Sequence, residues 1–194
     1  LKLDDGPPLL VTILDMANLN VLLKAEDLGV DLTRPLEHLQ GDGALLDRLD
    51  QIRATVLIRL GMASTTTAAE MIRRSVNPLV QLLAAPQSYR NLVGHEVTIG
   101  SHDVLSRSYA RRAFSKAFPG TGAIGTAVGA FLNGTVADIY GRNAVSQSRI
   151  RIGHPGGCLS VAVTLSNAEA EPCIREAIIG RTARVLLEGY AYLD

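Results

Sequence analysis

The most constraining feature of the sequence is an apolar run of small residues from Pro119 to Leu132. It predicts a helix that is apolar on all sides, opened by a Gly/Thr turn and closed at Asn133-Gly134. A helix without a polar face has to be surrounded by protein, and this one is much shorter than a membrane span. We therefore expect the rest of the chain to wrap around it.

Gly122, Gly125 and Gly129 lie three and four residues apart, on one face of this helix. Each costs about 1 kcal/mol of helix propensity relative to alanine, so we expect neighbouring strands to approach closely there. Thr121 is expected to cap the helix start, where free N–H groups and the helix dipole attract an anion such as a carboxylate. Two interpretations stay open: an ordinary capped core helix, which the pattern alone favours, or a carboxylate or oxyanion site.

Composition narrows the class of protein. The chain has 194 residues, 47% of them hydrophobic and 20% charged, as is typical of a soluble globular protein. A formal net charge of zero argues against a broad nucleic-acid surface. The two cysteines, Cys158 and Cys173, match neither a disulfide framework nor a metal site, so a reducing, cytoplasmic setting is expected. We expect no membrane association, since no apolar run has membrane length.

Hydrophobic periodicity predicts an α+β fold around the central helix. An amphipathic helix is expected from Asp42 to Leu60, capped by Asp42 and ended by a left-handed Gly61, and a last helix from Glu171-Pro172 to Gly189. The segment 102–118 is equally compatible with helix and strand. Strands are expected over residues 9–14, 21–25, 77–84, 135–140, 149–152, 159–165 and 190–193, and turns or loops over 26–29, 64–69, 89–94 and 141–148.

Common cofactor motifs are weak or missing. The four histidines show no zinc-binding spacing, and there is no phosphate-binding Walker loop or GxSxG nucleophile motif. The bare GxGxxG pattern from Gly120 to Gly125 follows a polar segment that ends in Pro119, so dinucleotide binding is not favoured. We therefore expect no metal and no organic cofactor.

Four motifs occur in order along nearly the whole chain. Asp15 to Asn18 reads DMAN, Lys116 to Ala123 reads KAFPGTGA with GTV at 134–136, Arg151 to Gly157 reads RIGHPGG, and Arg175 to Tyr190 contains RTARVLLEG. They resemble the DAGNP, HKA…TGA…GTV, RIGHPSG and RTAR.L.EG elements of the PrpF family. That family includes 2-methylaconitate and aconitate isomerases, methylitaconate isomerase and 4-oxalomesaconate tautomerase.

The resemblance implies a diaminopimelate epimerase-like fold, in which two similar halves each wrap strands around a central helix and enclose the active site between them. The chain resembles only the second half, so residues 1–194 are expected to form one lobe of a longer protein, with an N-terminal lobe as partner. In the family a Cys and a Lys of the first half move the proton. Neither has a counterpart here, and Pro119 stands where the epimerases carry a second cysteine. No catalytic residue is therefore expected in this chain.

The resemblance further implies a cofactor-independent isomerase that shifts an allylic proton on an unsaturated di- or tricarboxylate. It favours the carboxylate-site interpretation of the helix start, with the backbone at Thr121-Gly122 as the binding group and His154 as loop organiser or hydrogen-bond partner. The residues expected to bind the acid are Asn18, Lys116, Thr121, Gly122, His154, Gly156 and Gly157. An isolated half would expose an apolar face, so association into homo-oligomers is also expected.

Three positions depart from the family pattern. Leu19 replaces proline, Ser115 replaces histidine before the lysine, and Gly156 replaces the serine of HPSG and its hydroxyl. These departures motivate an alternative, in which the lobe is a non-catalytic binding or assembly module that keeps the fold.

Overall fold

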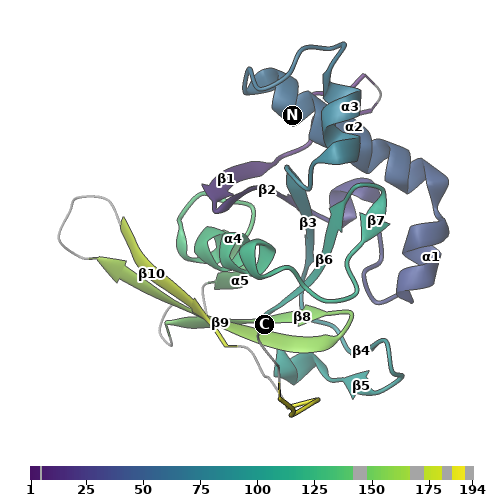
Figure 1. Cartoon of the computed structure of the whole chain (residues 1–194). Coiled ribbons are helices and arrows are strands. Elements are labelled where there is room, and N and C mark those ends of the chain that lie inside the picture. The colour runs from purple at the N-terminus through teal and green to yellow at the C-terminus, as the bar shows by residue number, and fades with distance from the viewer. Residues whose placement is uncertain (5, 142–147, 167–172, 181–184, 191–194) are drawn as a thin grey trace.

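The computed structural model describes residues 1–4, 6–141, 148–166, 173–180 and 185–190. Its centre is one curved, eight-stranded sheet in the order β1-β2-β3-β6-β8-β9-β10, with β7 paired to β6, and this sheet curls around helix α4 (Figure 1). The strands of the sheet are β1 Thr12–Met16, β2 Asn18–Lys24, β3 Leu79–Ala84, β6 Val104–Ala110, β7 Ala113–Phe114, β8 Arg149–His154, β9 Gly157–Ser166 and β10 Cys173–Ile179.

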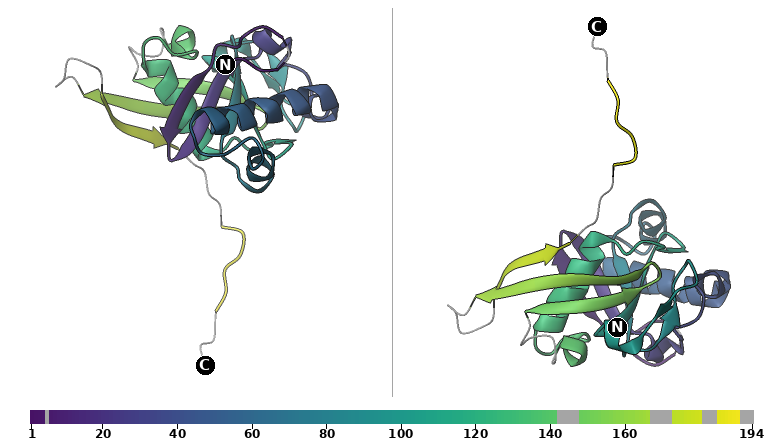
Figure 2. Two further views of the ribbon diagram at one scale, coloured as in Figure 1. Left: turned by 90° about the horizontal axis from the view of Figure 1, so that it is seen from above. Right: turned by 90° about the horizontal axis from the view of Figure 1, so that it is seen from below.

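Helices cover both faces of this sheet. The helices are α1 Leu36–Gly41, α2 Gly43–Arg59, α3 Ala68–Arg74, α4 Gly120–Phe131 and α5 Asp138–Gly141, and the separate hairpin is β4 Tyr89–Arg90 with β5 Glu96–Val97. Helices α1 to α3 lie on the outer side, while the hairpin of β9 and β10 extends beyond the body of the sheet (Figure 2). No helix in the described ranges is long and apolar enough to cross a membrane.

The central strands are buried on both faces. In β2, Val21 and Leu23 join the apolar cluster beneath α2, whereas Leu22 joins the cluster around α4. In β3, Leu82 and Leu83 divide between the two clusters in the same way. Because both sides are covered, these strands read in the sequence as continuous apolar runs rather than as alternating patterns.

The predicted central helix is confirmed, and the reason for its glycines is close packing on the sheet. A Cβ at Gly122 would lie 2.4 Å from Gln81 Nε2, and one at Gly129 would lie 2.5 Å from Leu22 Cδ1. Real Cβ atoms do not approach neighbouring atoms this closely, so a larger residue at either position would force the Gln81 or Leu22 side chain to shift, and glycine leaves α4 close to β2 and β3 without that rearrangement.

The amphipathic helix α2 also forms as predicted. Asp42 caps it by accepting a hydrogen bond from the Leu45 N–H at 3.0 Å, and Gly61 follows its end with φ +69°. The segment 102–118, which was compatible with helix or strand, contains strands β6 and β7. The predicted β8–β9 hairpin is confirmed, with Ile152 opposite Leu159. Helix α3 was missed, because it begins inside the segment 64–69 that we expected to be a loop.

Three predicted elements are wrong or shifted. The first strand begins at Thr12 rather than at residue 9. The segment 135–140 is not a strand: the Thr135 Oγ1 accepts from the Asp138 N–H at 3.1 Å and starts the short helix α5. The last helix is also wrong over Cys173–Ile179, which forms strand β10 antiparallel to β9. Residues 185–190 have no regular structure, and the remaining parts of the predicted last helix and terminal strand lie largely outside the described residues.

The exchange of helix for strand at β10 follows from tertiary contact. Ile174, Ala177 and Ile179 pack against the apolar cluster around α4, and a register irregularity between Ile174 and Glu176 keeps them on that side. Residues spaced three apart also suit a helix face, so the local pattern was ambiguous and pairing with β9 decided it.

Candidate carboxylate site

Helix α4 begins at Gly120, two residues earlier than it would with Thr121 as its N-cap. Pro119 is the N-cap residue, with φ −62° and ψ 133°, and makes no side-chain capping bond. The prediction that Thr121 caps the helix is therefore wrong, because Thr121 already lies in the first turn. The first intrahelical bond runs from Ala123 N–H to the Pro119 carbonyl, so the N–H groups of residues 120–122 have no partner within the helix.

A hollow of about 520 Å³ lies at this helix start. Its polar lining comes from Asn18, Arg111, Ser115 and Thr121, which belong to distant parts of the sequence. The rest of the lining is Val76, Leu79, Ala110, Ala113, Phe114 and Pro119. The structure thus brings two predicted residues, Asn18 and Thr121, into one concave site.

The reversal between β1 and β2 places Asn18 in the hollow. Ala17 has φ +65°, and Asn18 pairs with Met16 across the turn. From there the Asn18 Nδ2 donates a hydrogen bond of 2.7 Å to Thr121 Oγ1, across a sequence separation of 103 residues. Asn18 therefore touches the helix start directly rather than only bonding within its own turn.

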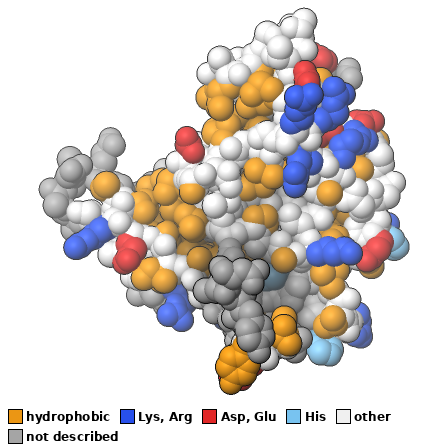
Figure 3. Space-filling model, viewed as in Figure 1, with side chains coloured by type: hydrophobic (Ala, Val, Ile, Leu, Met, Phe, Trp, Pro, Cys, Tyr) orange, Lys and Arg blue, Asp and Glu red, His pale blue; other side chains and the backbone are white. Residues whose placement is uncertain are grey.

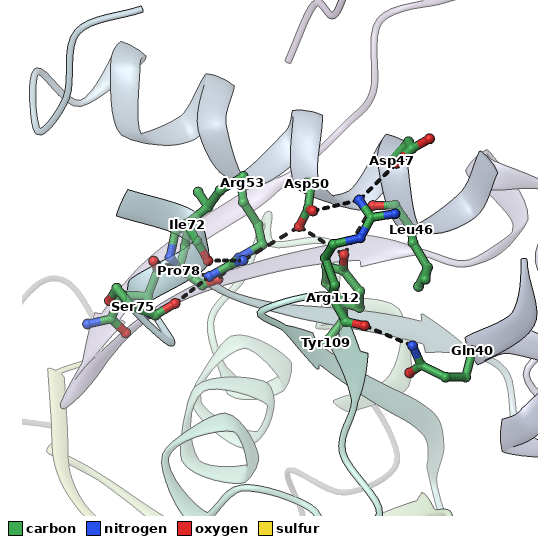
Figure 4. Close-up of polar contacts among 11 residues, drawn as sticks. Gln40, Leu46, Asp47, Asp50, Arg53, Ile72, Ser75, Pro78, Tyr109 and Arg112 are labelled. Carbon is green, nitrogen blue, oxygen red and sulfur yellow. Dashed lines mark hydrogen bonds and ion pairs between the residues drawn. The ribbon is translucent and has the colours of Figure 1, made fainter. Parts of the chain in front are cut away.

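Arg111 reaches the hollow from the turn between β6 and β7. Arg111 and Arg112 have φ +50° and +57°, the backbone of a tight hairpin turn that usually takes asparagine and glycine. The Arg112 guanidinium is paired with Asp47 at 2.8 Å and Asp50 at 3.1 Å on α2. Gln40 donates to the Arg112 carbonyl at 2.8 Å (Figure 4). These contacts hold the turn.

Arg111 is the functional candidate that sequence reasoning missed. It is exposed, and none of the described residues forms an ion pair or hydrogen bond with its side chain. Basic side chains gather on the face shown in Figure 3, over the region of α2, α3 and β7. A free guanidinium beside open helix N–H groups suits a second carboxylate of the same ligand. No local motif marks Arg111, because its place depends on the fold of the β6–β7 hairpin.

The HPGG turn forms a second group, on the other side of the segment that leads into α4. The His154 ring packs against Phe118 with 5.7 Å between centroids, and its Nδ1 accepts from the Gly156 N–H at 3.1 Å. The Tyr89 hydroxyl lies 2.7 Å from the His154 carbonyl oxygen, to which it donates. Burial, and next the charge of Arg107, lowers the pKa of His154 to about 4. The imidazole is therefore neutral at neutral pH, and its contacts are those of a loop organiser.

The two glycines of the turn differ in their surroundings. A Cβ at Gly156 would lie 3.0 Å from His154 Cε1 and 3.7 Å from the Lys116 carbonyl oxygen. Gly157 has φ +137°, and its carbonyl accepts from the Tyr89 hydroxyl. The Lys116 side chain is exposed, and Lys116 belongs to the segment that leads into α4. These residues shape the approach to the helix start but do not line the hollow.

Gly122 takes part only through its backbone. The position of its missing side chain faces Gln81 beneath the helix, not the hollow. A bulky substitution there would therefore disturb the packing of α4 on β3, and it would not test the carboxylate site by itself.

Comparison with known proteins identifies the family. A family model described as "PrpF protein" matches residues 2–194. The chain belongs to the PrpF family. The 3-methylitaconate isomerase of Eubacterium barkeri is 28% identical over 185 residues, covering 95% of the chain and 47% of that relative. The 2-methyl-aconitate isomerase of Shewanella oneidensis is 29% identical, covering 88% of the chain and 42% of that relative.

The fold agrees with this PrpF assignment. A crystal structure of methylitaconate-delta-isomerase superposes with a TM-score of 0.75 at 27% identity, covering 88% of the chain and 45% of that protein. The 4-oxalomesaconate tautomerase of Pseudomonas putida is 29% identical and covers 92% of the chain. The chain spans slightly less than half the length of these curated PrpF relatives, which are named as isomerases or tautomerases.

Proposed function

We propose that this chain is the carboxylate-binding lobe of a PrpF-type isomerase that shifts an allylic proton on an unsaturated di- or tricarboxylate. The observation that carries the proposal is the hollow at the start of α4. It combines the open N–H groups of the first helical turn with the Thr121 hydroxyl and the Arg111 guanidinium. The relatives' names support the substrate class, since each contains methylitaconate, methyl-aconitate or oxalomesaconate.

The geometry suits the charge that such a reaction creates. Removing an allylic proton places negative charge next to a carboxylate, and N–H groups at a helix start stabilise charge there with little reorganisation. Arg111, which also lines the hollow, provides an anchor for a further carboxylate and so orients the carbon skeleton of the acid. In this proposal His154, Gly156 and Gly157 organise the turn packed against the segment that leads into α4, and the exposed Lys116 adds positive charge in that segment.

The proton-transfer groups of the reaction come from elsewhere in this proposal. The side chains that line the hollow include no carboxylate, thiol or imidazole that could act as a base. We propose that a second lobe, bearing the Cys and Lys expected from the family resemblance, closes over the hollow. We place the reaction in the cytoplasm, where the free thiols of Cys158 and Cys173 stay reduced.

A ligand titration followed by NMR tests the binding role. We would add trans-aconitate to the labelled 194-residue chain and follow the backbone amides, with Arg111→Asn as the test variant because asparagine tolerates the left-handed φ of this turn. Shifts are expected around residues 18 and 120–122, and R111N should weaken binding about 10-fold through loss of a charged hydrogen bond. Arg59→Asn, at the exposed end of α2, is the control and should leave the affinity unchanged.

The same samples in heavy water separate the isomerase from the alternative module. Deuterium uptake at carbon would mean that this lobe carries its own base. Binding of the acid without deuterium exchange at carbon is expected if the proton-transfer groups belong to a second lobe. Failure of trans-aconitate, cis-aconitate and methylaconitate to shift any amide near Thr121 would instead favour a non-catalytic assembly module.

A further inference from the structure

Beneath the start of α4 the sheet carries two fully buried amides. Asn20 on β2 and Gln81 on β3 are both 0% exposed and both lie on the side that faces α4. The Gln81 Nε2 lies 3.4 Å from Asn20 Oδ1, to which it donates. The Asn20 Nδ2 donates to the Asn18 carbonyl at 2.7 Å. The buried side chains of Asn20 and Gln81 thus restrain Asn18, the residue whose side chain contacts Thr121 at the helix start.

Asn18 in turn restrains the side chain of Thr121 through a hydrogen bond. Its Nδ2 donates to Thr121 Oγ1 at 2.7 Å, so the threonine oxygen already accepts a hydrogen bond. The hydroxyl proton is left to donate, and among the described residues the Thr121 hydroxyl donates no hydrogen bond. The open space beside Thr121 is the hollow. The restraint therefore favours a hydroxyl whose proton is available to a carboxylate in the hollow.

Stability alone does not favour an amide at position 81. The Gln81 Oε1 is buried and has no hydrogen-bond partner among the described residues, which is an unfavourable state for a polar atom. Its Nε2 would lie only 2.4 Å from a Cβ at position 122, so α4 needs a glycine there to accommodate it. An apolar side chain of the same length would avoid the desolvation of the amide, and what it would lose is the long 3.4 Å hydrogen bond to Asn20 Oδ1.

We propose that Gln81 is a positioning residue of the carboxylate site. It orients the Asn20 amide, Asn20 clamps the backbone of Asn18, and Asn18 turns the Thr121 hydroxyl toward the ligand. The proposal deepens the proposed function and rests on it, because it assigns the buried pair a role in binding the carboxylate at the start of α4.

A double-mutant cycle on the full chain tests this role, with Gln81→Met and Thr121→Val as the two substitutions. Methionine matches the length of glutamine but cannot donate to Asn20. We expect Q81M to weaken the binding of trans-aconitate about 3- to 10-fold and T121V about 10-fold, as for loss of a hydrogen bond to a charged group. The double variant should bind as T121V does, within about twofold, because Gln81 acts only through the hydroxyl.

Two further readouts separate positioning from general damage. The melting temperature of Q81M should stay close to that of the wild type, because the variant removes the unpaired Gln81 Oε1 but leaves the buried Asn20 Oδ1 without its donor. The side-chain amide resonances of Asn18 should shift in Q81M and stay in place in Leu83→Met, a control on the same strand and the same side of the sheet. A melting temperature that falls together with affinity, or unchanged Asn18 resonances, would overturn the positioning role.

The binding data also distinguish the two proposals. If Q81M weakens binding equally in the wild-type and T121V backgrounds, the route through Thr121 is wrong while the carboxylate site stands. If the wild-type chain binds no trans-aconitate, the carboxylate site is overturned together with the role of Gln81. Shifted Asn18 resonances in Q81M would then show only that the buried restraint exists.

Discussion

At the scale of single residues, the glycines of α4 are set by what lies beneath them. We predict that Gly122→Ala lowers the free energy of unfolding by about 1–3 kcal/mol, because its Cβ would overlap Gln81 on β3. Gly43→Ala is the matched control in the first turn of α2, where a Cβ meets no atom within 4 Å. It should leave stability unchanged or raise it by up to about 1 kcal/mol. Urea denaturation measures both, and equal effects would contradict the packing argument.

His154 makes stability depend on pH. Its pKa is lowered from 6.5 to about 4, chiefly by burial, so below pH 6.5 the unfolded chain takes up a proton that the folded chain refuses. The free energy of unfolding should fall as pH drops from 6.5 to 4, by up to about 2 kcal/mol after allowance for partial exposure.

The variant His154→Asn isolates this contribution. Asparagine offers an oxygen near the position of Nδ1, which accepts from the Gly156 N–H, but it does not titrate. Denaturant midpoints between pH 4 and 7.5 should therefore fall less steeply for the variant than for the wild type. Parallel curves would show that His154 titrates normally in the folded state. The pKa of His102 is lowered as well, mainly by burial. Its contribution to the pH dependence of stability is expected to be the same in the variant and the wild type.

At the scale of elements, one buried cation ties α2 both to α3 and to the loop before β3. The Arg53 side chain is 0% exposed and donates to the carbonyls of Pro78, Ile72 and Ser75, each at 2.8 Å (Figure 4). The Asp50 carboxylate, whose Oδ1 lies 3.6 Å from Arg53 Nη1, balances the charge and also accepts a hydrogen bond from the Tyr109 hydroxyl. Burial lowers the pKa of Arg53, but its carbonyl and carboxylate partners keep the charged form satisfied.

Arg53→Met should lower the free energy of unfolding by about 3 kcal/mol or more, because two buried carbonyls and one half-buried carbonyl lose their donor and Asp50 loses this partner. Methionine keeps the apolar stem, so the loss reports the guanidinium. Arg59→Met, on the exposed last turn of the same helix, is the control and should change stability by less than about 0.5 kcal/mol. Chemical denaturation compares the two. A small effect of R53M would mean that water replaces the guanidinium without strain.

At the scale of the whole molecule, the protection of backbone amides from hydrogen exchange should be highest in the covered middle of the sheet and lowest at its edge. Strands β3 and β6 lie in the middle of the sheet with covered faces, whereas β10 is paired only with β9 among the described strands and is partly exposed. We predict that amides of β10 exchange with solvent about 100-fold or more faster than those of β3. Hydrogen–deuterium exchange with mass spectrometry measures this. Equal protection would indicate that another surface covers β10 in solution.

The local sequence pattern was sufficient to predict those elements that depend on residues close together in the chain. The apolar run of α4, its glycine face, the Asp42 cap of α2 and the RIGHPGG hairpin depend on spacings of a few residues, and the structure has all of them. The helix pattern had already marked Thr121, and the family resemblance added Asn18 as a binding residue; the two meet at the start of α4. Neither the pattern nor the resemblance predicted the correct N-cap of α4. Pro119 is the N-cap residue, with an extended backbone, and the helix begins at Gly120.

Contacts between distant segments settled the rest. Segment 173–179 became a strand because β9 was available to pair with it, against a spacing that also fits a helix. The hollow needs Asn18, Arg111 and Thr121 from three separate elements, and the buried pair of Asn20 and Gln81 joins strands 61 residues apart in sequence. Local propensity acts over one or two turns of chain, whereas burial and hydrogen bonding of such groups exist only after the chain has folded.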